Sequence, residues 1–370
     1  MIAVCRSAAA NAGENTSGGG VDTSSAAEAC DDAVPDEREK LLRRFDAFYH
    51  RLAWQRLQAV EHVWAISDIH VEVKANQAWL ESLEDRPTDA LIVAGDVTHS
   101  LDSLRVTLVT LVRKFKYVFF CVGNHELWHM RGDQERTADA IAKLLYIYHM
   151  VHSVGAFAAP ALLGDPATGD GVALVGMQSW YQPHFLSLGH GPSLNLFREG
   201  NDRNMQMAMM MDGAVKWPDC LAQTPHGPDI RRAQFFADMN RGFLADIAPE
   251  VSAEGDASPL IRGWPVLTFS HFLPHPQLHR GYRVLEHIEG SLILGEQLKR
   301  LHAAAGTPTV AHHHHVHVFG HTHFSQEEYI DGVRYVQHPL GNPRERSNGW
   351  QIRTSERNPF ALVWSRARTT

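Results

Sequence analysis

The first half of the chain alternates short apolar runs with amphipathic segments. The apolar runs lie at residues 62–67, 90–95 and 117–123, and segments with helical spacing lie near 75–84, 100–115 and 137–149. Runs that are apolar at consecutive positions, rather than at alternate ones, are typical of strands covered on both faces. This order predicts βαβ units and an α/β fold.

The second half of the chain adds more strands than helices. Further strand-like runs lie at 171–179, 265–270, 316–320, 333–337 and 360–365. One clear helix is expected, at 231–247. The excess of strands indicates a second sheet, so the expected architecture is two sheets packed together and flanked by helices.

Three segments depart from this pattern. Residues 1–35 are rich in Ala, Ser and Gly with almost no large apolar side chain, which predicts a disordered tail. Residues 36–61 carry apolar side chains at helical spacing, so we expect an amphipathic helix packed on the domain that follows, with partner binding as the alternative. Between 181 and 262 the alternation lapses, which predicts an insertion within a domain that spans 62–370.

Composition narrows the class of protein. The 370 residues are 44% hydrophobic, enough for one large core or two smaller ones. A formal net charge of −8 gives no broad basic surface, which disfavours nucleic acid as a partner. The four cysteines form no CxxC pair, and the sequence shows neither a secretory signal nor an apolar stretch that could span a bilayer. We therefore expect a cytoplasmic protein without a membrane partner.

Five of the strand-like runs end in residue types that bind metal ions. The motifs are SDIH, GDVTH, GNHE, SH and GHTH, and their candidate residues are Asp68, His70, Asp96, His99, Asn124, His125, Glu126, His271, His321 and His323. Ligands gather at the carboxyl ends of strands in α/β sheets, so the five loops are expected to converge on one site. Residues two apart in an extended segment point the same way, which suits the DxH and HxH spacings.

The residue types in these motifs indicate a particular chemistry. Asp, His and Asn without Cys suit Mn, Fe, Zn or Ni, and a carboxylate can bridge two ions. Two divalent ions about 3.5–4 Å apart can hold the attacking and leaving oxygens of a phosphate ester and generate hydroxide near neutral pH. The set predicts a site with two divalent metal ions, whose identity the residues leave open.

The order DxH, GD, GNHE, H and GHxH resembles the calcineurin-like metallophosphoesterase family over roughly residues 61–345. The resemblance implies an α/β fold of four layers, an α/β/β/α sandwich of two mixed sheets flanked by helices. It also implies a dinuclear metal site. Carried over by position, the first metal would be held by Asp68, His70 and His323, the second by Asn124, His271 and His321, with Asp96 bridging the two.

His125 matches the family's histidine that contacts the substrate phosphate and protonates the leaving group. A histidine suits that role because its pKa lies near neutrality. Protein Ser/Thr phosphatases orient this histidine with an Asp and bind phosphate with an Arg that follows, whereas here His99 occupies the Asp position and the Arg is missing. Purple acid phosphatases have a Tyr at the same position. Both branches are disfavoured, and the group that orients His125 is left open.

Several further residues have more than one interpretation. Glu126 is expected to support the ligands rather than bind a metal, and His99 either supports the site or has no role. Trp180 and Tyr181 follow a strand that should end near the site, so they either line the substrate pocket or pack in the core. Arg344 either binds phosphate or is solvated.

The segment AHHHHVHVFGHTHF, residues 311–324, contains seven histidines. Only His321 and His323 follow the strand at its carboxyl end, so residues 312–315 at its other end are expected to have no role in chemistry.

The sequence thus predicts a metal-dependent phosphoesterase. We expect a hydroxide that bridges two metals to attack a small phosphomonoester or phosphodiester, while His125 assists departure of the alcohol. The alternatives are a scaffold or binding protein that keeps the fold without catalysis, and a nuclease.

Overall fold

The computed structural model describes residues 36–52, 54–130, 132–188, 213–222, 230–247, 260–280, 285, 287–308, 314–347 and 359–367. The strands are β1 (Gln55–Leu57), β2 (His62–Ile66), β3 (Arg86–Ala94), β4 (Phe115–Cys121), β5 (Ala161–Leu163), β6 (Val172–Gly176), β7 (Val266–Phe269), β8 (His315–Phe319), β9 (Gln326–Ile330), β10 (Val333–Gln337) and β11 (Ala361–Ser365). The α-helices are α1 (Glu37–Leu52), α2 (Lys74–Ser82), α3 (Leu101–Lys114), α4 (Asn124–Leu127), α5 (Ala140–Ser153), α6 (Phe185–Leu188), α8 (Arg231–Met239), α9 (Arg241–Ile247), α10 (Leu292–Ala305) and α11 (Pro343–Ser347).

The strands form two mixed sheets. The larger sheet has seven strands in the order β1-β5-β6-β7-β8-β10-β9, and the smaller has four in the order β11-β2-β3-β4. In the smaller sheet β2, β3 and β4 are parallel and β11 runs against them. In the larger sheet β6, β7, β8 and β10 are parallel. The carboxyl ends of these parallel strands carry the loops predicted to bind metal.

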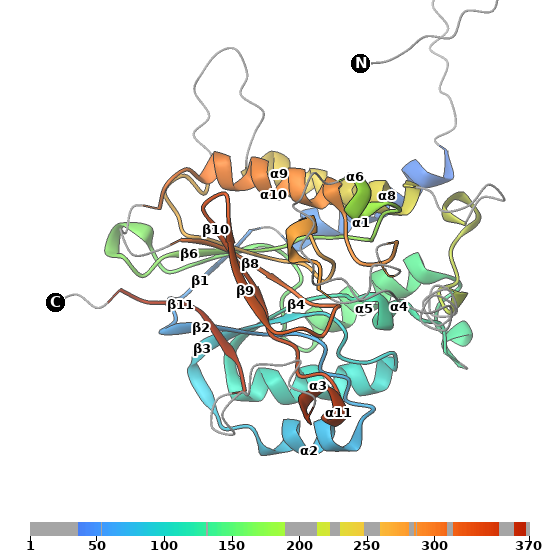
Figure 1. Cartoon of the computed structure of the whole chain (residues 1–370), viewed down its shortest axis with the longest axis horizontal. Helices are drawn as coiled ribbons and strands as arrows, with labels where there is room; N and C mark the ends of the chain where they lie inside the picture. The colour runs from blue at the N-terminus through green and yellow to red at the C-terminus, as the bar shows by residue number, and fades with distance from the viewer. Residues whose placement is uncertain are drawn as a thin grey trace, which may run out of the picture. The chain divides into compact units, whose positions relative to one another are not determined.

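The continuous apolar runs are explained by the layers on either side of each sheet. In β2, Val63 and Ala65 lie in the core between the two sheets, whereas Trp64 and Ile66 lie in the core beneath the helices. Helix α3 packs on β4 of the smaller sheet and α10 packs on β7 of the larger one. Figure 1 shows α2 and α3 beyond the smaller sheet, and α8 and α10 beyond the larger. The expected α/β/β/α sandwich of two mixed sheets is confirmed.

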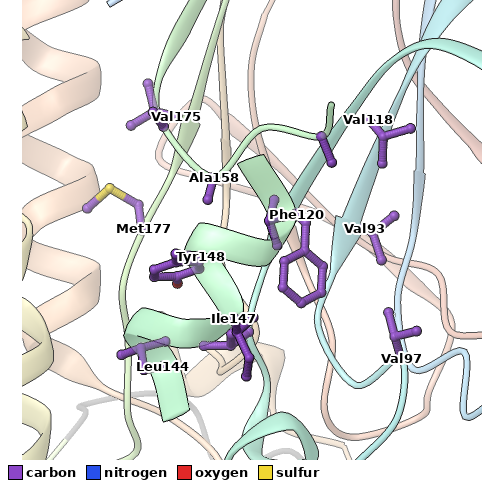
Figure 2. Close-up of a cluster of buried hydrophobic side chains, with 14 of the residues drawn as sticks. Val93, Val97, Val118, Phe120, Leu144, Ile147, Tyr148, Ala158, Val175 and Met177 are labelled. Carbon is purple, nitrogen blue, oxygen red and sulfur yellow. The ribbon is translucent and has the colours of Figure 1, made fainter. Parts of the chain in front are cut away.

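Helix α5 joins the two halves of the core. Its residues Ile147 and Tyr148 are buried among side chains of both sheets, with Phe120 of β4 on one side and Val175 of β6 on the other (Figure 2). Because α5 packs against both sheets at once, it fixes the edge of the sandwich next to the β4 loop.

The helix predicted at 36–61 is too long. Helix α1 ends at Leu52, and the chain then enters β1, which pairs with β5. Within α1, Phe45 and Phe48 are buried, and the helix contacts α8 and α9. The apolar spacing was correct for the helix, but the short strand that follows it has no pattern of its own.

The helix predicted at 231–247 is two helices, α8 and α9, interrupted at Asn240. Asn240 is buried and its side chain hydrogen-bonds both backbone groups of Gln178, accepting from the N–H at 2.8 Å and donating to the carbonyl at 2.9 Å. The interruption therefore attaches this part of the predicted insertion 181–262 to the loop after β6. Much of the rest of the insertion, and the predicted tail 1–35, lie outside the described residues.

None of the helices in the described ranges has the length and apolar character needed to cross a membrane.

Candidate metal centre and active site

Five loops bring the seven predicted metal ligands together at the carboxyl ends of β2, β3, β4, β7 and β8. Three groups have ligand atoms within 4.8 Å of one another, and two of them consist of predicted metal ligands alone: Asp68 with His70 and His323, and Asp96 with His271 and His321. The third is His70 with Glu72 and His125. Asn124 joins the second group, because its Oδ1 lies 3.1 Å from His271 Nε2 and 3.0 Å from His321 Nδ1. The two groups coincide with the two metal-binding sets expected from the motifs.

In the first group, outer hydrogen bonds determine which histidine nitrogens face the centre. His70 Nδ1 donates to Glu72 at 3.1 Å, and His323 Nδ1 donates to Glu345 at 3.0 Å. The Nε2 atoms of the two rings then face each other at 3.1 Å. In neutral imidazoles both atoms carry lone pairs, so a cation between them is the group that satisfies both.

The second group has the same arrangement with backbone acceptors. His271 Nδ1 donates to the carbonyl of Ala94 at 3.0 Å, and His321 Nε2 donates to that of Ile288 at 2.8 Å. The remaining ring nitrogens converge on the amide oxygen of Asn124 and the Asp96 carboxylate. Such convergence of acceptors, with every outer nitrogen already hydrogen-bonded, fits a second divalent ion.

Backbone strain is concentrated at the same residues. Five of the seven predicted ligands have positive φ: Asp68 (51°), His70 (48°), Asp96 (54°), His321 (82°) and His323 (58°). Each such conformation costs on the order of 1–3 kcal/mol, and such strain clusters at functional sites. These loops therefore adopt locally unfavourable backbone conformations, and in those conformations their side chains converge on one place.

Two glycines permit the close approach of these loops. A Cβ on Gly95, whose φ is +80°, would lie 2.6 Å from His271 Nδ1, and one on Gly123 would lie 2.2 Å from Asp96 Oδ1. No larger residue fits at either position without moving a ligand.

Glu126 links the loops after β3 and β4 through hydrogen bonds. It is buried, and its two carboxylate oxygens accept hydrogen bonds from the backbone N–H groups of Gly123 (2.7 Å), Asp96 (3.0 Å), Val97 (2.7 Å) and Thr98 (3.2 Å). This geometry fits the expected supporting role, because the carboxylate oxygens of Glu126 are turned to the backbone.

Opposite charges balance one another within the site. Burial raises the pKa of Asp68, but the neighbouring His323 outweighs this and holds that pKa at about 2. Burial lowers the pKa of His271, but the Asp96 carboxylate 3.3 Å away raises it to about 9. The negative charge of Asp96 also acts on Asp68 and His70 of the first group, as a ligand shared between two ions would.

His125 lies beside the ligands without belonging to either group of predicted metal ligands. Its Nε2 is 3.8 Å from Asp96 Oδ2, and its backbone N–H donates to Asp96 Oδ1 at 2.9 Å. Burial lowers the pKa of His125 to about 4. The side chain is partly exposed, at 16%.

The other predicted site residues lie further out. His99 Nδ1 is 4.0 Å from Glu72 Oε1, which places His99 near the site. Trp180 is buried in the core against Phe272, and Phe272 in turn contacts His321, so Trp180 supports the site from behind and does not line it.

Tyr181 is partly buried and packs edge to face on Phe272. Arg344 is exposed on α11, whereas the nearby Arg346 donates to the carbonyls of Leu340 and Gly341 and so braces the loop after β10.

The sequence analysis missed three residues of the site: Glu72, Trp128 and Glu345. Glu72 extends the period-two spacing from Asp68 and His70, a signal that was available in the sequence. Trp128 stacks on His125 with ring centroids 3.7 Å apart. Glu345 lies 22 positions after His323 on another element, and no local pattern indicates that contact.

The histidines at the start of β8 differ from one another. Residues 312 and 313 lie outside the described ranges, and His314 is exposed. His315 and His317 are buried: His315 Nε2 donates to the carbonyl of Gly306 at 2.6 Å, and His317 bonds Thr268 and Ser270. They take part in the hydrogen bonding of the larger sheet, away from the loop that carries His321 and His323.

Comparisons with known proteins match this chain to phosphoesterases. The family model for calcineurin-like phosphoesterases matches residues 61–227, which contain the first three motifs. The acyl-carrier-protein phosphodiesterase PptH of Mycobacterium tuberculosis is 28% identical to this chain over 294 residues, which is 76% of this chain and 78% of that protein.

A solved structure shares the fold. The crystal structure of the phosphopantetheinyl hydrolase PptH from Mycobacterium tuberculosis superposes with a TM-score of 0.51 at 22% identity, covering 83% of this chain and 97% of that one. His271, His321 and His323 lie beyond the segment that the family model matches, and the fold brings them to the residues within it. The motifs and these matches make the chain similar to the calcineurin-like phosphoesterases over the segment that the family model matches, and the solved structure shares its fold.

Proposed function

We propose that this protein is a phosphodiesterase that hydrolyses a phosphodiester between a small organic group and a carrier protein. The observation that carries the proposal is the convergence of seven metal-ligand side chains, in two groups, next to His125. The similarity to the acyl-carrier-protein phosphodiesterase PptH, over about three quarters of both chains, supports this substrate class.

Each group of side chains has a distinct role in this proposal. Asp68, His70 and His323 would hold one divalent ion, and Asn124, His271 and His321 the other, with Asp96 shared between them. When bound, the two ions lower the pKa of a water molecule toward about 7 and neutralise charge on the phosphate oxygens. The outer hydrogen bonds to Glu72, Glu345 and two backbone carbonyls keep the ligand rings oriented.

We assign His125 the role of proton donor in this scheme. Its Nε2 lies 3.8 Å from Asp96 Oδ2, and its side chain is partly exposed. Burial lowers the pKa of His125 to about 4, so the protonated donor is the minor form of the ring at neutral pH. An alcohol leaves as a strongly basic alkoxide unless its oxygen is protonated, and a positioned acid contributes on the order of 10²–10⁴-fold to such a step. The role is therefore most demanding for an alkyl phosphodiester such as a phosphopantetheinyl linkage.

The proposal is tested by a turnover screen with each candidate metal. The substrates are p-nitrophenyl phosphate, bis(p-nitrophenyl) phosphate, cyclic nucleotides, phosphoproteins and phosphopantetheinylated acyl carrier protein, with loss of the arm from the last followed by mass spectrometry. We expect turnover of bis(p-nitrophenyl) phosphate and of phosphopantetheinylated acyl carrier protein to exceed that of the two monoester substrates. Chelated protein and the Asp96→Asn variant are the controls, and both should be inactive.

Other outcomes of the screen would contradict the proposal. A protein that binds metal but hydrolyses none of these esters would be a scaffold. Preferential hydrolysis of the monoesters would make it a phosphatase, and cleavage of single-stranded DNA or RNA, added to the same screen, would make it a nuclease.

A further inference from the structure

The ring of His125 is oriented without a hydrogen bond to a carboxylate. Its Nδ1 atom is buried and has no hydrogen-bond partner among the residues that the structure describes. His99, which occupies the position of the orienting Asp of protein Ser/Thr phosphatases, does not bond it. The ring must therefore be held in place by packing.

The nearby carboxylate is already engaged. Glu72 has an oxygen within 4.8 Å of a His125 ring nitrogen, but it accepts a hydrogen bond from His70 Nδ1 at 3.1 Å. His99 Nδ1 also approaches the same oxygen, at 4.0 Å. Glu72 thus hydrogen-bonds His70 of the first group, and the ring of His125 packs against aromatic neighbours.

Trp128 supplies the packing surface. Its ring stacks on His125 with centroids 3.7 Å apart and an interplanar angle of 30°. His70 contacts the same imidazole edge to face, with centroids 4.6 Å apart. A flat ring held against an indole face cannot rotate out of that plane without losing the contact, so the stack holds the plane of the His125 ring.

Trp128 is itself anchored. Its backbone N–H donates to the carbonyl of His125 at 3.2 Å, and its carbonyl accepts a hydrogen bond from the Lys143 ammonium. The Lys143 side chain is fully buried, and its Nζ also donates to Asp133 Oδ2 at 2.8 Å and to the carbonyl of His99 at 3.2 Å. A buried ion pair thus connects the segment that carries Trp128 to α5 and to the β3 loop.

We propose that Trp128 is a positioning residue for His125, and that its aromatic stack takes the place of the orienting carboxylate of protein Ser/Thr phosphatases. The inference rests on the proposed function, since it assumes that His125 protonates the leaving oxygen. It predicts that loss of the indole ring impairs reactions that need this proton and spares those that do not.

The test compares two substrates that differ only in the leaving group: methyl p-nitrophenyl phosphate and methyl phenyl phosphate. The p-nitrophenolate leaves readily without a proton, whereas the phenolate depends more on an acid. The readout is kcat for the p-nitrophenyl ester divided by kcat for the phenyl ester. Both values come from one manganese-loaded preparation, so an inactive fraction of the protein lowers both equally and does not change the ratio. We expect His125→Ala to raise this ratio by about a hundredfold and Trp128→Leu by about tenfold.

Three controls define the role of the ring. Trp128→Phe keeps a flat face and should leave the ratio within about threefold of the wild type. The double variant His125→Ala with Trp128→Leu should match His125→Ala alone, because the two residues act in one step. Trp79→Leu removes a partly buried tryptophan on α2 that packs on Phe360, and it should leave the ratio unchanged.

Three results would overturn the inference. Trp128→Leu that slows both substrates equally would show a role in folding or metal binding only. If Glu72→Gln gave the same ratio as His125→Ala and Trp128→Leu did not, the Glu72 carboxylate rather than Trp128 would position the His125 ring. An unchanged ratio in His125→Ala would refute the proposed role of His125 as proton donor. This result can be distinguished from the other two because it concerns His125→Ala alone. If Trp128→Leu does not fold, Trp128→Met gives the same comparison, because methionine fills irregular space without a flat ring.

Discussion

Acidification is expected to weaken metal binding at this site, because the predicted ligands His271 and His323 must lose a proton before they can bind a metal ion. Burial lowers the pKa of His271, but the Asp96 and Asp68 carboxylates outweigh it and raise that pKa to about 9. Burial also opposes the charged form of His323, yet Asp68 and Glu345 raise the pKa of His323 well above its ordinary value. Below these pKa values the metal-free site holds protons that the ions must displace.

The size of the effect follows from the pKa of His271. Each pH unit below that pKa costs about tenfold in apparent affinity for an ion bound through this ring, so a fall from about pH 9 to about pH 7 costs about a hundredfold, or about 2.7 kcal/mol. The raised pKa of His323 adds a dependence of the same direction for the other ion. Binding at neutral pH should therefore release protons, among them the proton of His271.

The same protons set the pH dependence of the metal-free fold. The pKa of His271 is raised above its ordinary value of about 6.5, so its contribution to stability is complete below about pH 6.5 and is lost as the pH rises toward 9. Chelated protein should unfold more readily at pH 9 than at pH 6.5, whereas tighter ion binding should give metal-loaded protein the opposite trend.

Isothermal titration calorimetry with manganese measures both quantities. Titrations at several pH values give the apparent affinity, and repeats in buffers of different ionisation enthalpy give the number of protons released. The matched control is His271→Gln, whose amide can bind a metal but has no proton to release, so it should release about one proton fewer. Equal affinity at pH 7 and pH 9, or binding at pH 7 without proton release, would refute the assignment of these rings as ligands.

Three further variants probe other parts of the site. Asp96→Asn removes the carboxylate shared by both groups and should reduce hydrolysis at least about a thousandfold with unchanged circular dichroism, and undiminished turnover under manganese would contradict its role. Gly123→Ala places a Cβ 2.2 Å from Asp96 Oδ1, so we expect metal content below that of the wild type by elemental analysis, and full occupancy would show that the loop can move. Lys143→Met leaves the Asp133 carboxylate, 11% exposed, without its cation and should lower the free energy of unfolding by about 3–5 kcal/mol in a urea titration. A loss under about 1 kcal/mol would mean that Asp133 is solvated in the variant.

The fold class could be predicted because both sheets are covered on both faces. Strands such as β2 and β3 are apolar at consecutive positions, a pattern that few other structures produce. The boundaries were less certain where tertiary contacts decide them. Helix α1 ends earlier than its apolar spacing suggests, and Asn240 separates α8 from α9 by bonding to a loop 62 residues away.

The candidate metal ligands could be predicted individually from the sequence because each follows a strand. Apart from Glu72, the groups that hydrogen-bond them could not be predicted in this way. Glu345 and the carbonyls of Ala94 and Ile288 contact the ligand rings from distant parts of the chain, and the orientation of His125 depends on Trp128. These contacts depend on how loops cross in space, which the order of residues does not record.

The sequence by itself determined the alternation of strands and helices, the residue types at the strand ends and therefore the chemical class of the site. These properties are local, because they depend on side chains two to four positions apart. Only the tertiary structure decided which ring nitrogen faces the metal positions, which loops are strained and what holds the proton donor. Those properties arise where two sheets bring five loops within hydrogen-bonding distance of one another, and such distances exist only once the chain has folded.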